Sequence, residues 1–173
     1  MRFLFFILCL MLTTTHTITP DKNDAENWYV INDGVMGGLS QSNFEITGKQ
    51  LRYYGHVSTR NNGGFASLRY NVKPLNINEV KSFKLTITGD GSDYEFRLRA
   101  AQDSWISYVY KFQTTGEKQT INFTVKDLKP QYRGRKLNKE VYNGKQLIEI
   151  GLLIGNKKEQ DFEILFHNLE IIE

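Results

Sequence analysis

Apolar and polar residues alternate over several stretches of the chain, which is the pattern of strands buried on one face. Residues 83–87 place Phe, Leu and Ile on one face, and residues 94–98 place Tyr, Phe and Leu on one face. Residues 105–112 and 119–125 repeat the alternation. Because successive side chains on a strand point to opposite faces, each stretch has one apolar face that can pack on a core. These stretches predict antiparallel β-strands.

About ten such strands are predicted from Trp28 onward. Residues 147–154 read LIEIGLLI, a continuous apolar run that favours a central strand. No segment shows an apolar stripe with the 3.6-residue period of a helix, and residues 126–145 predict a long irregular connection. This spacing of short strands predicts an all-β fold, a two-sheet antiparallel β-sandwich or a barrel.

The N-terminus has the pattern of a secretory signal peptide. Arg2 is followed by ten apolar residues, 3–12, and then by small polar residues. Ten apolar residues are too few to span a bilayer, which takes about 20. We therefore expect a signal peptide at 1–19, a polar lead-in at 20–27 and one β-sandwich domain at 28–173. The expected location is secreted or periplasmic, with no transmembrane span in the mature chain.

Few groups suited to catalysis or metal binding would remain after removal of that leader. Cys9 is the only cysteine, and His56 and His167 are the only histidines beyond the leader. No serine stands in a GxSxG turn. We expect no enzymatic activity, no catalytic residue, no metal site and no cofactor. The formal charge of +3 is too small to argue for nucleic acid as a partner.

Three glycine-rich stretches interrupt the predicted strands: NDGVMGGLS at 32–40, NNGG at 61–64 and GDG at 89–91. Glycine is favoured where the backbone needs a positive φ or comes close to other atoms. Asp90 and Asp93 could be read as a pair of catalytic carboxylates. Because Gly-Asp-Gly stands between two alternating stretches, we interpret this stretch as a hairpin turn instead.

A basic run covers residues 126–145, with seven Lys and Arg against Asp127 and Glu140. It is either a solvated loop face or a surface for an anion or a partner. Arg133-Gly134-Arg135 favours the second interpretation, because arginine guanidinium groups bind carboxylate and phosphate with two hydrogen bonds.

Together these stretches resemble the complex I intermediate-associated protein family. The resemblance begins with Trp28 and NDGVMGGLS and then follows this order: GHVSTRNNGGFASLR at 55–69, TGDGSDYEFRLR at 88–99, YRGR at 132–135 and EIGLLIG at 149–155. It implies a galactose-binding-like β-sandwich, a jelly roll similar to certain carbohydrate-binding modules, with no established catalytic activity. The chain departs from mitochondrial members in its leader, so complex I assembly is not carried over to it.

The matching stretches supply candidate structural and binding residues. A structural role is expected for Trp28, Gly34, Met36, Gly37, Gly38, Gly63, Gly64, Phe65 and Tyr94. We hypothesise that a binding site forms where three loops meet two arginines at one shared edge; its residues are Asp33, Asn62, Asp90, Arg133 and Arg135. Within it, Arg133 is expected to pair internally and Arg135 to face a partner. The alternative is a set of independent turns with one buried salt link.

The function we expect is non-enzymatic binding of a protein partner, with a role in assembling a larger complex, such as a membrane complex or its assembly intermediate. The alternative is a carbohydrate-binding module. Carbohydrate recognition usually needs aromatic platforms, for which Trp105, Tyr108 and Tyr110 are the candidates. Alternation places Trp105 on the opposite face from the two tyrosines.

Overall fold

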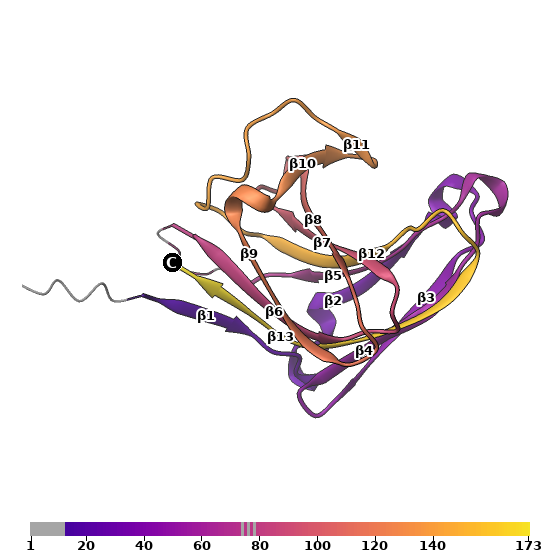
Figure 1. Ribbon diagram of the computed structural model, residues 1–173, viewed down its shortest axis with the longest axis horizontal. Coiled ribbons are helices and arrows are strands. Elements are labelled where there is room, and N and C mark those ends of the chain that lie inside the picture. Colours follow the sequence, from indigo (N-terminus) through magenta and orange to yellow (C-terminus); the bar gives the residue numbers. More distant parts are fainter. Residues whose placement is uncertain (1–12, 74, 76, 78) are drawn as a thin grey trace, which may run out of the picture.

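The computed structural model describes residues 13–173 except residues 74, 76 and 78, and it describes only the backbone of residues 35 and 36. Two antiparallel sheets lie face to face and share one apolar core (Figure 1). The predicted all-β, two-sheet antiparallel sandwich is therefore confirmed. Residues 1–12, which include the apolar part of the predicted signal peptide, lie outside the described residues.

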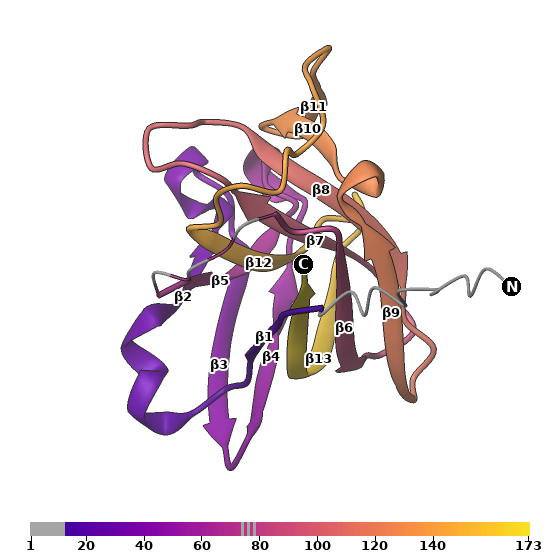
Figure 2. The ribbon, with the colours of Figure 1, turned by 90° about the vertical axis from the view of Figure 1, so that its left-hand side faces the viewer.

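Sheet A has six strands in the order β3-β4-β13-β6-β9, with β1 also paired to β13. Its strands are β1 (Thr15–Ile18), β3 (Gln41–Thr47), β4 (Gln50–Val57), β6 (Ser82–Thr88), β9 (Lys118–Thr124) and β13 (Gln160–Ile172). The first half of β13 pairs with β4, and its last four residues, 169–172, pair with β1. Figure 2 shows β1 running beside the C-terminal end of β13.

Sheet B has seven strands in the order β11-β10-β8-β7-β12-β5-β2. Its strands are β2 (Trp28–Asn32), β5 (Ala66–Asn71), β7 (Asp93–Arg99), β8 (Ser107–Gln113), β10 (Lys129–Tyr132), β11 (Arg135–Lys136) and β12 (Glu149–Ile154). Four short 3-10 helices complete the described elements: η1 (Lys22–Asn27), η2 (Asp33–Met36), η3 (Arg60–Asn62) and η4 (Val125–Asp127).

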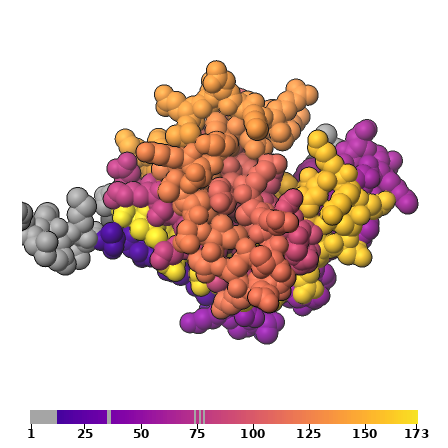
Figure 3. Space-filling model, in the orientation of Figure 1, coloured from indigo at the N-terminus to yellow at the C-terminus, as the bar shows by residue number. Residues whose placement is uncertain are grey.

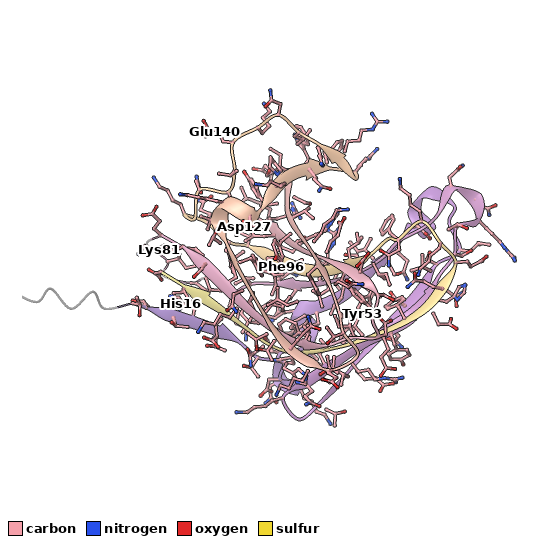
Figure 4. All side chains as sticks on the ribbon, viewed as in Figure 1. His16, Tyr53, Lys81, Phe96, Asp127 and Glu140 are labelled. Carbon is pink, nitrogen blue, oxygen red and sulfur yellow. The ribbon has the colours of Figure 1, made fainter. Side chains whose placement is uncertain are left out.

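The inward faces of the alternating strands fill the space between the sheets. Phe83 on β6 is fully buried, and its ring lies 5.1 Å from that of Phe123 on β9. Phe96 on β7, which is labelled in Figure 4, meets the same Phe123 ring from sheet B at 5.1 Å between centroids. Buried aromatic pairs of this kind dominate core energetics. The central strand predicted at 147–154 corresponds to β12, which lies between β5 and β7 and is buried along its whole length.

Two predicted segments contain more structure than expected. The connection at 126–145 includes β10 and β11, which are hidden in the sequence because one is short and contains Pro130 and the other has only two residues. At the N-terminus, β1 forms from residues assigned to the signal peptide, and η1 forms from the polar lead-in. The Asp24 carboxylate anchors η1 by accepting a 2.6 Å hydrogen bond from the hydroxyl of Tyr70.

Candidate functional site

Asp33 joins two of the glycine-rich stretches through one buried carboxylate. Its Oδ1 accepts a hydrogen bond from the backbone N–H of Ser40 at 3.0 Å, and its Oδ2 accepts one from the Ser40 hydroxyl at 2.6 Å. Oδ2 also accepts from the backbone N–H groups of Gly64 at 2.6 Å and Phe65 at 3.2 Å. Burial alone would raise the pKa of this carboxyl, but the hydrogen bonds outweigh burial and lower the pKa. Asp33 therefore holds loops together.

Glycines are required around this carboxylate. A Cβ atom on Gly38 would collide with the Asp33 side chain, and one on Gly63 would lie 2.6 Å from Oδ2. Gly37 and Gly64 have φ values of +85° and +133°, which other residues rarely adopt. By contrast, a Cβ on Gly34 would have no atom within 4 Å.

Trp28 and Tyr94, two further residues for which a structural role was expected, are buried in the core. The Trp28 ring lies 4.5 Å from that of Tyr70, centroid to centroid. Tyr94 is buried, and its hydroxyl donates a 3.1 Å hydrogen bond to Asp90. The side chain of Met36 lies outside the described residues.

Asp90 is also occupied by contacts within the fold. Its Oδ2 accepts a second hydrogen bond, of 2.9 Å, from the backbone N–H of Glu163 on β13, and its Oδ1 accepts one of 2.9 Å from Ser92. The turn between β6 and β7 is thereby fixed to β13. The Asp90–Asp93 stretch is a turn, as the sequence indicated.

The five hypothesised binding residues do not form one cluster. Asp33 and Asn62 lie beside β2 and β5 at one edge of sheet B, whereas Arg133 and Arg135 lie at the opposite edge. β10 and β2 are five strand spacings apart, or roughly 20 Å or more across the sheet. Figure 1 shows β10 and β11 at the top of the molecule, well away from the turn that leads into β3. The hypothesis that these loops and the two arginines meet at one shared edge is therefore wrong. It was made without knowledge of the order of strands in the sheet.

Arg133 is not paired internally, in contrast to the expectation. Arg133 and Gly134 have φ values of 47° and 76° and form the two-residue turn between Tyr132 and Arg135. Positive φ at both positions is the geometry of a type I′ hairpin turn. The turn directs the Arg133 guanidinium over the Tyr132 ring, 5.2 Å from its centroid. In the described part of the chain, neither Arg133 nor Arg135 forms a salt bridge, and both are exposed.

The outward side of sheet B carries six charged residues and one tyrosine that contact one another. We call this surface the charged face, and its members are Tyr29, Arg69, Glu95, Arg97, Arg99, Lys111 and Glu149. The centre of the face is Glu149, whose side chain is 9% exposed and lies between Arg69 at 3.3 Å and Arg99 at 3.2 Å. The Tyr29 hydroxyl donates a 2.7 Å hydrogen bond to Glu149, and burial together with this bond raises the pKa of Tyr29.

The second half of the charged face is built around Glu95. This carboxylate lies 3.0 Å from Arg97 and 3.0 Å from the Lys111 ammonium group. Beside it, Glu95 and Lys111 line a pocket of about 390 Å³ together with Asn156 and Lys157. The sequence signal for this face was the alternation of Glu95, Arg97 and Arg99 with buried apolar residues on β7. The pairing with Glu149 was not predictable without the strand register.

Two aromatic residues and one arginine lie together beside the charged face: Trp105, Tyr132 and Arg133. We call this set of residues the aromatic rim. Trp105 is 55% exposed, and its ring meets the Tyr132 ring edge-on at 4.7 Å. Arg99 holds the loop before Trp105 by donating hydrogen bonds to the carbonyls of residues 102 and 104 at 2.8 and 3.2 Å. The charged face thus positions the rim.

The other two candidate platform residues face inward. Tyr110 stacks on Phe123 at 4.4 Å between centroids, and Tyr108 packs on Tyr142 at 5.5 Å. They are packing residues, as their alternation with Trp105 indicates. Within residues 13–173, gaps excepted, no group of three or more His, Cys, Asp or Glu is placed to hold a metal ion. The same residues contain no helix with the length and apolar character needed to cross a membrane.

Comparison with known proteins gives one family match and several structural matches. A family model described as complex I intermediate-associated protein 30 matches residues 18–166. A search of curated proteins found no match. The fold is similar to a family 11 carbohydrate-binding module from Clostridium thermocellum in complex with a β-1,3-1,4-mixed-linked tetrasaccharide. That match has a TM-score of 0.61 and 14% identity, and covers 90% of this chain and 94% of the other.

Two more structures show the same architecture. A family 11 module of a cellulosomal cellulase of Clostridium thermocellum has a TM-score of 0.62 and 13% identity, with 88% and 93% of the two chains covered. A family 29 carbohydrate-binding module has a TM-score of 0.55 and 11% identity, with 93% and 89% covered. At these identities the likeness shows the β-sandwich fold alone.

Proposed function

The chain belongs to the complex I intermediate-associated protein 30 family, and on that premise we propose that it is a non-catalytic binding domain for a protein partner. The observation that carries the proposal is the aromatic rim. Trp105 is exposed although it is large and apolar, and it lies against Tyr132 with Arg133 over the same ring. Trp, Tyr and Arg are the residues most enriched where truncation weakens protein interfaces.

The charged face supports the rim by holding it in a fixed position. Arg99 is tied to the buried Glu149 and to two carbonyls of the Trp105 loop. A loop that is ordered before binding loses less conformational entropy when a partner docks. A pre-ordered aromatic side chain at the edge of a polar face is therefore suited to recognition.

The family name suggests what kind of partner this is. It refers to association with an intermediate of complex I, and we extend the proposal to a role in assembling a larger membrane complex. The location we propose is outside the cytoplasm, on the basis of Arg2 and the apolar residues 3–12. Cell fractionation tests the location: the processed protein is expected in the secreted or periplasmic fraction, and the unprocessed chain in the cytosol would contradict it.

Site-specific photo-crosslinking in the native cell tests the binding function. A benzoylphenylalanine placed at the exposed Asp103, next to Trp105, is expected to give a discrete adduct, and Trp105→Ala in the same chain is expected to abolish it. The same crosslinker at Asn122, exposed on β9 of the other sheet, is the position control. Leu39→Ala removes another large apolar side chain, 50% exposed, and is expected to leave the adduct intact. Equal adducts from both crosslinker positions, or an adduct that survives Trp105→Ala, would contradict the proposal.

A second candidate function is glycan binding, which the pocket beside Glu95 favours. Its lining of Glu95, Lys111 and Asn156 offers donors and acceptors for sugar hydroxyls. A glycan array with the purified protein tests this candidate. Retention that Glu95→Gln abolishes and Trp105→Ala does not change would place a glycan in this pocket.

A further inference from the structure

The positive charge of the chain is concentrated in residues 126–145, which we call the basic segment. The chain has 22 Lys and Arg, and seven of them lie in the segment; it has 19 Asp and Glu, and two of them lie there. The segment therefore has a net charge of +5. The rest of the chain, with 15 Lys and Arg and 17 Asp and Glu, has a net charge of −2. Figure 3 shows the segment, in orange, projecting at the top of the molecule.

The positive side chains of the basic segment are exposed and are not neutralised by the fold. They are Lys126, Lys129, Arg133, Arg135, Lys136, Lys139 and Lys145. In the part of the chain that the structure describes, none of the seven forms a salt bridge. Of the two carboxylates, Asp127 is occupied by capping Thr124 at 2.7 Å, and Glu140 lies at the outer end of the loop (Figure 4). The segment therefore presents uncompensated charge to a ligand.

Apolar contact area lies next to this charge. Tyr132 belongs to the basic segment and joins it to Trp105 on the loop after β7. Arg133 has φ 47°, a conformation in which a residue other than glycine is strained, so its backbone is held there at a cost in stability. This turn places the Arg133 guanidinium over the Tyr132 ring, which Trp105 contacts at its edge, so the charge lies beside the apolar contact area.

We propose that the basic segment and the aromatic rim together bind an acidic segment of a partner protein, with carboxylates on the Arg and Lys side chains and an apolar side chain on Trp105. The proposal rests on the proposed function and names the chemistry of its partner. A peptide fits this surface because it can offer carboxylates to the basic side chains and an apolar side chain to the exposed Trp105.

Fluorescence anisotropy of the full chain with a defined probe tests this proposal. The probe is a short labelled peptide that repeats Asp-Glu-Phe, and its uncharged counterpart repeats Asn-Gln-Phe. The acidic peptide is expected to bind and the uncharged one is not, with affinity falling as salt rises. A triple variant, Arg133→Asn with Arg135→Gln and Lys136→Gln, is expected to weaken binding about tenfold, because three surface charge contacts are lost. Asn at position 133 still tolerates the positive φ.

A matched triple variant controls for net charge. Lys22→Gln with Lys49→Gln and Lys158→Gln removes three exposed charges that lie outside the basic segment. It is expected to change the affinity less than twofold. Equal losses in both triple variants, or tighter binding of single-stranded DNA, a polygalacturonate oligomer or anionic vesicles than of the peptide, would overturn the proposal. If the peptide fails to bind while the Trp105-dependent crosslink persists, the acidic chemistry is wrong and the binding function stands.

Discussion

The Asp33 carboxylate accepts a 2.6 Å hydrogen bond from the backbone N–H of Gly64, 31 positions further along the chain. This bond ties the turn after β2 to the loop before β5, and the two strands are neighbours in sheet B. Two glycine-rich motifs that look independent in the sequence are therefore one structural unit. The unit belongs to the scaffold, because its carboxylate is used entirely by bonds within the fold.

Replacing this carboxylate by an amide is expected to destabilise the protein. In Asp33→Asn, an NH₂ group replaces one of the two accepting oxygens. Even if the amide oxygen keeps the three bonds made to Oδ2, the buried N–H of Ser40 loses its acceptor and faces an NH₂ group. The expected loss is about 2 kcal/mol of unfolding free energy, measured by urea denaturation. Asp103→Asn, at an exposed position, is the control and is expected to leave the midpoint unchanged. Identical midpoints for the two variants would show that the unit tolerates loss of the charge.

The lowered pKa of Asp33 gives this contribution a defined pH dependence. The unfolded chain has an Asp pKa near the ordinary value of 3.8, and the folded protein has a lower one. The contribution is therefore complete above that ordinary value and is lost as the pH falls through the folded pKa. The stability difference between the wild type and Asp33→Asn is expected to shrink below pH 3.8, as measured by thermal unfolding at several pH values. A difference that stays constant throughout acidification would contradict the assignment.

Two glycines of the same motif are expected to differ sharply in tolerance. Gly38→Ala places a methyl group against the Asp33 side chain, whereas Gly34→Ala places one where no atom lies within 4 Å. The first variant is expected to lose about 1–3 kcal/mol, as in other overpacked sites, and the second to stay close to wild type. Differential scanning calorimetry of the pair measures this. A melting temperature that falls equally in both would mean that glycine is needed there for chain flexibility alone.

The sequence predicts the strands and their inward faces because alternation is a local property. The order of strands is not local, and the predicted binding cluster failed for that reason: Asp33 and Arg133 lie at opposite edges of sheet B. Part of the charged face could be predicted from the sequence, because Glu95, Arg97 and Arg99 alternate with apolar residues along one strand. Its buried centre, Glu149, could be found only once β12 was known to lie between β5 and β7.

Loss of the Glu149 charge is expected to weaken the face that supports the rim. Glu149→Gln removes the charge shared by Arg69, Arg99 and Tyr29, and leaves two partly buried guanidinium groups without a carboxylate. The expected loss is about 2 kcal/mol, measured by urea denaturation, with the exposed Glu140→Gln as the matched control. Because Arg99 also holds the Trp105 loop, tryptophan fluorescence is expected to report greater solvent access in Glu149→Gln. An unchanged spectrum would show that the position of Trp105 does not depend on the charged face.

The N-terminal strand leads to the last prediction. β1 covers the edge of β13 at residues 169–172, and the carbonyl of Thr14 accepts a 3.0 Å hydrogen bond from the N–H of Glu173. The His16 ring lies 2.9 Å from the Glu173 carboxylate, and Ile18 is buried in the core. Removal of residues 1–19 would delete all of these contacts and expose a strand edge that favours aggregation.

A protein that lacks residues 1–19 is therefore expected to be less stable than one that lacks residues 1–12. The difference is expected to be at least about 2 kcal/mol, the value of burying one Ile side chain, and to appear in urea denaturation of the two purified proteins. We therefore expect that signal processing, if it preserves these contacts, leaves a mature chain that begins at or before Thr14. N-terminal sequencing of the protein from its native host determines this. A mature chain that starts at Pro20 and matches the longer protein in stability would show that β1 contributes nothing to the folded domain.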